Sequence, residues 1–258
     1  MKHRPRTYDC FPFNNELDLL ECRLTELYDS VDGFVLVEAT VDHQDHAKPL
    51  WFAEHRERYA QWTDKITHVV ADDLPSLAVD NGPWAREHAQ REWIGAGLHR
   101  LDAHVDDIVL QSDVDEIPTP VAARNVRPAG TNLVSFDQRG HFWAIDWIYP
   151  PGWRGTVAAR AGAISTFRHM RDVRNFAMPI PDAGWHFSWL GGRTAALAKV
   201  GSFCHPEVRP RIETNADRYY SQGIHVDGVR LLPVEVDKSW PAWMQTEKVP
   251  ESWRRPRN

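Results

Sequence analysis

The chain has 258 residues, of which 42% are hydrophobic and 26% charged, an ordinary composition for a soluble globular protein of one large or two small domains. Its net charge of -6 gives no general attraction to nucleic acid or to an anionic membrane. No apolar run has the length of a membrane span and no apolar signal segment follows the basic residues 2–4, so a cytoplasmic location is expected. Cys10, Cys22 and Cys204 lack metal-ligand spacing and are expected to be reduced and mostly buried.

Strands and helices are expected to alternate in the first half of the chain, residues 7–118. Short β-prone apolar runs predict strands, and apolar residues at helical spacing predict helices between them. This alternation is typical of an α/β fold with a mostly parallel central sheet, right-handed crossovers and helices on both faces. The predicted strands are residues 7–11, 34–37, 66–71 and 108–110, and the predicted helices are residues 17–31, 51–62 and 84–101.

The second half, residues 119–231, has a different pattern. Residues 132–149 are β-prone with one interrupting glycine, which predicts a hairpin or bent pair of strands closed by the Pro-Pro-Gly at 150–152. Repeated prolines prevent long elements in residues 232–258, which are expected to form an extended tail. No linker separates the halves, so a single domain is predicted. The predicted helices here are residues 121–126, 164–173, 193–203 and 215–220.

A cluster of acidic residues follows the predicted strand 108–110 at once. Asp113, Asp115 and Glu116 therefore lie at the carboxyl end of a buried strand, the edge at which open α/β sheets bind ligands. Carboxylates two residues apart point to the same side and can share one divalent cation, which keeps other positions for water or phosphate. Acidic residues after strands also occur simply as turn formers and helix caps, and this structural interpretation stays open from the spacing alone.

Three polar residues of the predicted helix 84–101 share part of one face. Arg86, Gln90 and Arg91 have the spacing to bind one phosphate group. The alternative is a solvated charged face shared with the neighbouring glutamates.

Histidines of the polar stretch 42–48 are a weaker candidate for a site. His43 and His46 can bind a metal, but no cysteine or carboxylate scaffold accompanies them. We therefore expect both side chains to be solvated in a surface loop.

Several long motifs, in order and spread over residues 7–208, resemble glycosyltransferase family 17. This is the family of β-1,4-mannosyl-glycoprotein β-1,4-N-acetylglucosaminyltransferases, which add the bisecting GlcNAc in animals. Motifs of this length are far more specific than an isolated Asp-X-Asp. The resemblance is carried by DCFPFNNELD at 9–18, by residues 34–40 and 86–91, by DVDEIP at 113–118 and by GWHFSW at 184–189.

The resemblance implies a GT-A type, Rossmann-like fold, a UDP-GlcNAc donor, manganese or magnesium as the cation, and inversion at the anomeric carbon. Residues 7–118 would bind the nucleotide sugar and residues 119–231 the acceptor. Asp113 and Asp115 match the family's Asp-X-Asp motif for the metal and the donor pyrophosphate, and His186 stands where many GT-A enzymes place a late metal ligand. Further donor-binding candidates, by position at strand ends or on helix 84–101, are Asn14, Asn15, Glu38, Arg86, Gln90 and Arg91.

An inverting transfer needs a general base that takes the acceptor hydroxyl proton. Asp182 is the first candidate because it precedes the Gly-Trp-His stretch, Glu207 is the second and Asp146 the third. Each can equally be a surface or capping carboxylate.

Tryptophan is in surplus, with 12 residues, and suits both core packing and stacking on sugar rings. Trp143, Trp147 and Trp185 are predicted to bind the acceptor, and Trp189 is a further candidate, with at least two of these four expected in the core. The chain lacks the membrane anchor and disulfide setting of animal members, so the expected acceptor is another glycan or a small glycoside.

Three other functions fit the same residues. The donor can be a different UDP-hexose, because a fold does not fix its substrate. A metal-dependent nucleotide-sugar hydrolase would use the same carboxylates and would need no sugar acceptor. A non-catalytic glycan-binding protein would use the tryptophans and would need no nucleotide.

Overall fold

The computed structural model describes residues 3–78 and 82–256. In this described part, nine strands form one continuous sheet. Its order is β3 (Ile66–Ala71), β2 (Gly33–Ala39), β1 (Thr7–Phe13), β4 (Ile108–Gln111), β7 (Trp147–Arg160), β6 (Val134–Phe142), β8 (Met178–Ser188) and β5 (Glu116–Pro118), with β9 (Leu232–Pro233) paired to β7. Strands from both halves of the chain thus belong to one sheet.

The direction of the strands changes at the middle of the sheet. The four strands β3, β2, β1 and β4 are mutually parallel. From β4 onward the pairs β4–β7, β6–β7 and β5–β8 are antiparallel, whereas β6–β8 is parallel. The short connection between β6 and β7 permits only an antiparallel pair. The predicted α/β fold is confirmed, with a parallel first half and a mixed sheet overall.

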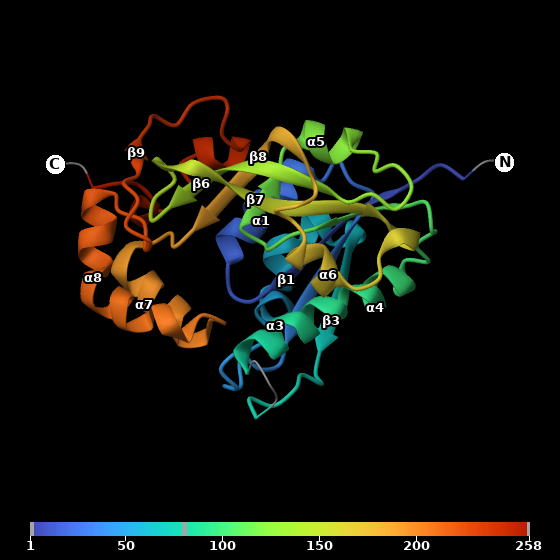
Figure 1. Ribbon diagram of the computed structural model, residues 1–258, viewed down its shortest axis with the longest axis horizontal. Helices are drawn as coiled ribbons and strands as arrows, with labels where there is room; N and C mark the ends of the chain where they lie inside the picture. Colours follow the sequence, from blue (N-terminus) through green and yellow to red (C-terminus); the bar gives the residue numbers. More distant parts are fainter. Residues whose placement is uncertain (1–2, 79–81, 257–258) are drawn as a thin grey trace.

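Helices cover both faces of the sheet, as predicted (Figure 1). Neighbouring residues of a strand face opposite layers: Val35 of β2 packs in the apolar cluster that contains α4 (Ile94–Arg100), and Phe34 packs in the cluster that contains α1 (Leu17–Leu27). The α4 layer also holds α3 (Pro83–Glu92) and α6 (Phe167–Asp172), and the α1 layer holds α5 (Pro120–Asn125).

Two further helices, α7 (Gly192–Ser202) and α8 (Arg209–Gln222), pack together at one end of the sheet, on the opposite side of the molecule from α4 (Figure 1). They share an apolar cluster with Trp143 and Trp189. Within residues 232–256 the chain forms β9 and two 3-10 turns and is anchored by buried Trp240 and Trp243.

Several predicted boundaries were wrong. The helix expected at 84–101 divides at Trp93 into α3 and α4, and the helix expected at 51–62 ends after one turn, α2 (Trp51–Glu54), before a 3-10 segment (Arg56–Lys65). Residues 150–152 do not close a hairpin but lie within β7, where the register against β6 shifts and the prolines need not donate to the ladder.

All three cysteines are free and buried, which confirms the prediction for them. Across residues 3–78 and 82–256, the structure contains no helix with the length and apolar character that a membrane crossing requires.

Candidate active site

A short turn between β4 and β5 carries the Asp-X-Asp motif, and buried Arg23 of α1 fixes its backbone. Nη1 of Arg23 donates to the carbonyl oxygens of Asp113, 2.9 Å away, and Glu116, 2.8 Å away. The guanidinium charge is matched by the equally buried Asp9, with oxygens at 2.6 and 2.7 Å. The Arg23–Asp9 ion pair and the two hydrogen bonds of Arg23 hold the motif at the carboxyl end of β4, where the sequence predicts it.

Two guanidinium groups bind the side chain of Asp113. Arg91 of α3 donates to Oδ1 at 2.7 Å, and Arg171 of α6 donates to Oδ2 at 2.6 Å. Desolvation would raise the pKa of Asp113, but the charges of Arg171 and Arg91 outweigh it and hold this pKa well below the usual range. Asp113 is therefore ionised, with both oxygens engaged.

Asp115 has a different pair of neighbours, His186 and Lys199. The register of β5 against β8 places Glu116 opposite His186, so His186 Nε2 lies 3.6 Å from Asp115 Oδ1. Nζ of Lys199, from α7, lies 3.4 Å from Oδ2. Desolvation opposes the charge of Asp115, but Lys199 and then His186 lower its pKa.

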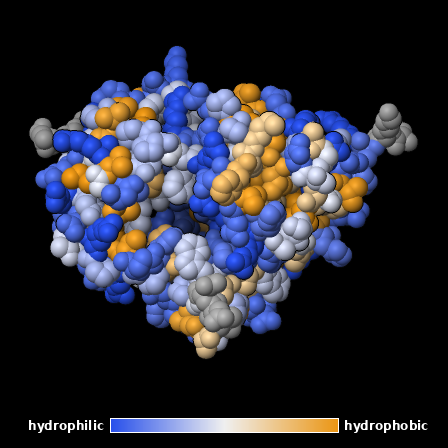
Figure 2. Space-filling view, in the orientation of Figure 1, coloured by the Kyte–Doolittle hydropathy of each residue, from blue (hydrophilic) through white to orange (hydrophobic). Residues whose placement is uncertain are grey.

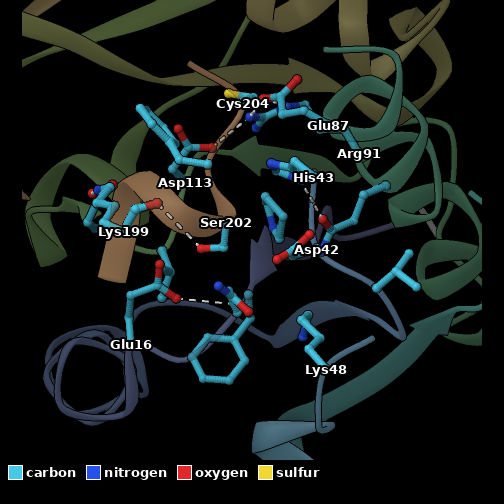
Figure 3. A pocket seen from close by; sticks show the side chains of 18 residues that line it. Glu16, Asp42, His43, Lys48, Glu87, Arg91, Asp113, Lys199, Ser202 and Cys204 are labelled. Carbon is cyan, nitrogen blue, oxygen red and sulfur yellow. Dashed lines mark hydrogen bonds and ion pairs between the residues drawn. The ribbon is translucent and has the colours of Figure 1, made fainter. Parts of the chain in front are cut away.

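A pocket with a cavity volume of about 140 Å³ opens beside these groups, and we call it the central pocket. Figure 2 shows a hollow in this face of the molecule, between α7 and α3. Figure 3 shows Lys199 on one side, near Asp113 and Glu16, with His43 and Asp42 across from it. The lining residues come from the end of β1, the loop after β2, α3, the motif turn and the end of α7: Pro12, Phe13, Asn14, Glu16, Val41, Asp42, His43, Lys48, Glu87, Gln90, Arg91, Asp113, Val114, Asp115, Lys199, Ser202, Phe203 and Cys204.

The central pocket contains two residues, Glu16 and His43, that the sequence analysis did not place in a site. Oε2 of Glu16 accepts the backbone N–H groups of Asn14 and Asn15 at 3.1 and 3.0 Å, and burial raises the pKa of this carboxyl. His43 was expected to be solvated, but it lines the pocket with Nε2 3.1 Å from Oε1 of Gln90, and burial lowers its pKa.

The predicted donor-binding residues divide into two groups. Asn14, Gln90, Arg91 and Asp113 line the central pocket, and Asn15 is exposed next to Asn14. The other two residues, Glu38 and Arg86, are buried outside the pocket lining.

Glu38 and Arg86 have structural partners instead. The Glu38 carboxylate accepts the backbone N–H of Phe52 at 2.9 Å and lies 2.8 Å from Nε2 of His68. Arg86 pairs with Asp45 and orders the loop after β2. Their positions do not support the predicted contacts with the donor.

None of the predicted general bases lines the central pocket. Asp182 is exposed in a separate hollow beside Thr119 and Val121. It lies four positions before His186 in β8, at an irregular part of the strand where its own φ is 49° and the register against β6 shifts. Glu207 is exposed and lies 2.7 Å from His205, and Asp146 pairs with Arg255. The structure therefore brings none of the three to Asp115.

The predicted acceptor tryptophans are mostly structural. Trp143 is fully buried, and Trp185 is buried with Nε1 donating to the Ser239 carbonyl at 3.0 Å. Trp147 is partly buried against Gly223 and Arg255. These positions agree with the expectation of core residues among the tryptophans, but they do not support contact of these three with a sugar.

A second cavity, of about 570 Å³, lies on the β6–β7 pair and is lined by Trp153, which the sequence did not single out. The Trp153 ring stacks on His186 with 4.2 Å between centroids, and its Nε1 donates to Oε1 of buried Glu116 at 2.7 Å. Trp153 thus lines this Trp153 cavity and stacks on His186, whose Nε2 lies 3.6 Å from Asp115 Oδ1. Its lining is Asp137, Gln138, Tyr149, Pro151, Gly152, Trp153, Arg154, Arg174 and Asn175.

Comparison with known proteins identifies the family. Residues 1–225 match the sequence profile of glycosyltransferase family 17, most of the chain. The chain belongs to glycosyltransferase family 17. The resemblance that the motifs indicate is thereby confirmed.

Relatives of this family 17 glycosyltransferase carry the name beta-1,4-mannosyl-glycoprotein 4-beta-N-acetylglucosaminyltransferase. The Rattus norvegicus protein is 26% identical over 215 residues, and the Homo sapiens protein is 25% identical over 215 residues. Each match covers 71% of this chain and 40% of the relative, so the chain spans less than half the length of these relatives.

Solved structures similar to this family 17 chain include two other proteins. Glycosyltransferase GlyE of Streptococcus pneumoniae has a TM-score of 0.34 and 12% identity, covering 67% of this chain and 38% of that one. An active-site mutant of LgtC has a TM-score of 0.35 and 12% identity, covering 66% and 65%.

The three metal ligands predicted for this family 17 enzyme fit a cation only in part. Among the residues that the structure describes, no group of three or more Asp, Glu, His or Cys is arranged to hold a metal. Both oxygens of Asp113 are bound to arginines. Asp115 Oδ1 and His186 Nε2, 3.6 Å apart, are close to the separation of about 3 Å between neighbouring ligands of one cation. These two residues fit a cation whose other positions are filled by phosphate and water.

Proposed function

We propose that this chain transfers N-acetylglucosamine from UDP-GlcNAc to a hydroxyl of a glycan or glycoside, with inversion to a β-linkage. One observation carries the proposal: an Asp-X-Asp turn at the carboxyl edge of a parallel sheet, with Arg91, Arg171 and Lys199 around it. Pyrophosphate is anionic, and such a group of cations suits its recognition. The family and the names of the relatives support the choice of sugar.

The donor would bind in the central pocket. Asn14, at the end of β1, and His43, beyond β2, offer polar groups to the ribose and the base. Arg91 would bind the diphosphate, because its Nη1 is buried without a hydrogen-bond partner among the described residues. Asp113 keeps Arg91 and Arg171 in place through the two ion pairs.

The main requirement of the transfer reaction is stabilisation of the negative charge that develops on the UDP leaving group. Asp115 and His186 would hold the manganese or magnesium ion, which supplies Lewis-acid stabilisation of the diphosphate. Arg91 and Lys199 donate hydrogen bonds to the same group. Trp153 stacks on His186 and keeps its ring in one orientation.

The acceptor would bind in the Trp153 cavity, with its reacting hydroxyl reaching past Trp153 and His186 into the central pocket, where Glu16 lies. A volume of about 570 Å³ suits a sugar ring, whose apolar C–H face packs on aromatic rings such as Tyr149 while Asp137 and Asn175 bind hydroxyls. Tyr149→Ala is expected to raise KM for a synthetic β-mannoside acceptor about tenfold, with KM for UDP-GlcNAc unchanged. Steady-state kinetics measure both constants. Tyr28→Ala, at the end of α1, is the matched control, and an equal rise in both constants contradicts the assignment.

Glu16 is the carboxylate that best fits the general base. It lines the central pocket, Oε2 accepts both of its backbone hydrogen bonds and leaves Oε1 without one, and burial raises its pKa. Glu16→Gln is expected to lower kcat about 10²-fold or more while UDP affinity changes less than twofold.

The pH dependence of Glu16 has a defined sign. A base acts when deprotonated, so kcat/KM of the wild type should fall as the pH drops through the raised pKa of Glu16, and the residual rate of Glu16→Gln should lose this limb. Asp182→Asn is measured in parallel. A large loss in Asp182→Asn with none in Glu16→Gln transfers the role to Asp182.

Calorimetric titration with UDP-GlcNAc and with UDP-glucose, each with manganese and with a chelator, tests the proposal as a whole. We expect manganese-dependent binding that favours UDP-GlcNAc, and transfer of the sugar to an acceptor in a coupled assay. Donor breakdown at the same rate without acceptor would identify a hydrolase. No nucleotide binding, together with binding of glycans, would identify a non-catalytic glycan-binding protein.

A further inference from the structure

Lys199 is the cation that α7 brings to the motif. Its Nζ lies 3.4 Å from Asp115 Oδ2 and 3.2 Å from Ser188 Oγ, at the long end of the hydrogen-bond range. The ammonium group also lies 5.5 Å and 5.6 Å from the ring centroids of Trp189 and Phe203. About 29% of the side chain is exposed. Long hydrogen bonds and cation–π contacts of this kind keep the ammonium group near Asp115 but do not fix its position.

The two arginines of the same site are held far more firmly. Arg91 bonds Glu87 as well as Asp113, and Arg171 bonds both oxygens of Glu116 at 2.8 Å in addition to Asp113. Each planar guanidinium thus bridges two carboxylates. Among the described residues Lys199 has one carboxylate, Asp115, within bonding distance, so it is the cation of these three that is free to move.

The charge balance around Lys199 changes when a divalent cation and the donor bind, and this change favours its movement. In the free protein its single charge offsets that of Asp115. A divalent cation between Asp115 and His186 would carry two positive charges, more than the single negative charge of Asp115. It would therefore repel the ammonium group of Lys199. The donor diphosphate then brings new negative charge into the central pocket, which Lys199 also lines.

The side chain of Lys199, not the helix that carries it, permits this movement. Contacts with the loop after β2 hold α7 in place, because Gln44 Nε2 donates to the carbonyl oxygens of Val200 and Phe203 at 2.9 and 3.2 Å. Lysine has a flexible four-carbon stem. Rotation about the bonds of this stem shifts the ammonium group from the carboxylate toward the space over the pocket.

We infer that Lys199 is an exchangeable counterion: it neutralises Asp115 in the free enzyme and moves to the donor diphosphate when a divalent cation occupies the space between Asp115 and His186. The inference rests on the proposed function, because it needs a nucleotide diphosphate in the central pocket. In this role Lys199 both competes with the cation and binds the leaving group.

The two roles predict opposite effects of one substitution. Lys199→Gln removes the competitor, so manganese alone is expected to bind about threefold to tenfold tighter. The same variant loses a charged donor to phosphate, so UDP in the presence of manganese is expected to bind about tenfold or more weakly. Lys199→Arg keeps the charge and should restore UDP binding. Calorimetry with manganese alone, and with UDP plus manganese, measures both quantities.

Arg193→Gln is the matched control, because Arg193 is on the same helix, loses the same charge and pairs with exposed Asp217 away from the pocket. It should change neither affinity. Lys199→Gln with both affinities unchanged, or with both weakened together, overturns the inference, since a merely structural lysine gives one of these results. If the wild type binds no UDP under any condition, the proposed function itself fails; if it binds UDP and Lys199→Gln binds it equally, only the inference fails.

Discussion

Asp115→Asn is expected to lower kcat about 10³-fold with little change in the stability of the fold. Asp115 lies 3.6 Å from His186, the other residue proposed to hold the cation, and among the described residues no arginine bonds its oxygens. Asparagine keeps the shape and removes the charge that would hold the cation at the leaving diphosphate. Single-turnover transfer assays give the rate, and calorimetry with manganese should show weakened binding.

Its matched control is Asp217→Asn on α8, where the carboxylate is exposed and pairs with Arg193. That variant should retain wild-type kcat. Full activity of Asp115→Asn would remove the carboxylate from the mechanism, whereas loss of the folded state in denaturation experiments would assign it a structural role instead.

Arg23→Met is expected to reduce the free energy of unfolding by about 3–5 kcal/mol, the largest stability effect that we predict. Arg23 and Asp9 are both fully buried, so the substitution leaves the Asp9 charge without its partner. It also removes the donor to the carbonyl oxygens of Asp113 and Glu116. Urea denaturation followed by circular dichroism measures the change.

Two further variants separate the causes. Arg58→Met removes a partly exposed arginine that pairs with Asp18 and Glu21, and it should cost about 0–1 kcal/mol. The double variant Asp9→Leu with Arg23→Met removes both buried charges and should regain part of the loss. Equal losses in Arg58→Met and Arg23→Met would contradict a special role for the buried pair.

The strands and the motif turn are predictable from the sequence because their signals are local. The apolar run at 108–110 and the acidic residues after it fix where β4 ends, and a parallel sheet then fixes the edge to which Asp113 and Asp115 belong. Glu38 shows the limit of this reasoning. It lies next to the last residue of β2, but its carboxylate accepts the backbone N–H of Phe52 and does not line the central pocket.

Partners of the motif are not predictable in this way, since they come from elements far along the chain. Arg171 and Lys199 lie 58 and 84 residues from the aspartates that they bind. Only the pairing of β8 with β5 and the packing of α6 and α7 bring them together, and no spacing in the sequence encodes that arrangement. Asp182 shows the same limit, since it is close to His186 in the sequence but exposed in a separate hollow outside the central pocket.

The unbroken sheet has a mechanical consequence. Four consecutive residue pairs join β4 to β7, at the boundary between the parallel strands and the rest. Opening the molecule along this boundary would break backbone hydrogen bonds in the centre of the sheet. The two halves are therefore not expected to open and close as rigid bodies. Adjustment to a bulky donor is then expected from side chains at the edge of the sheet, such as Lys199 near the C-terminal end of α7. The enzyme is therefore expected to bind its donor on a rigid sheet, with a mobile lysine side chain at the edge of the pocket.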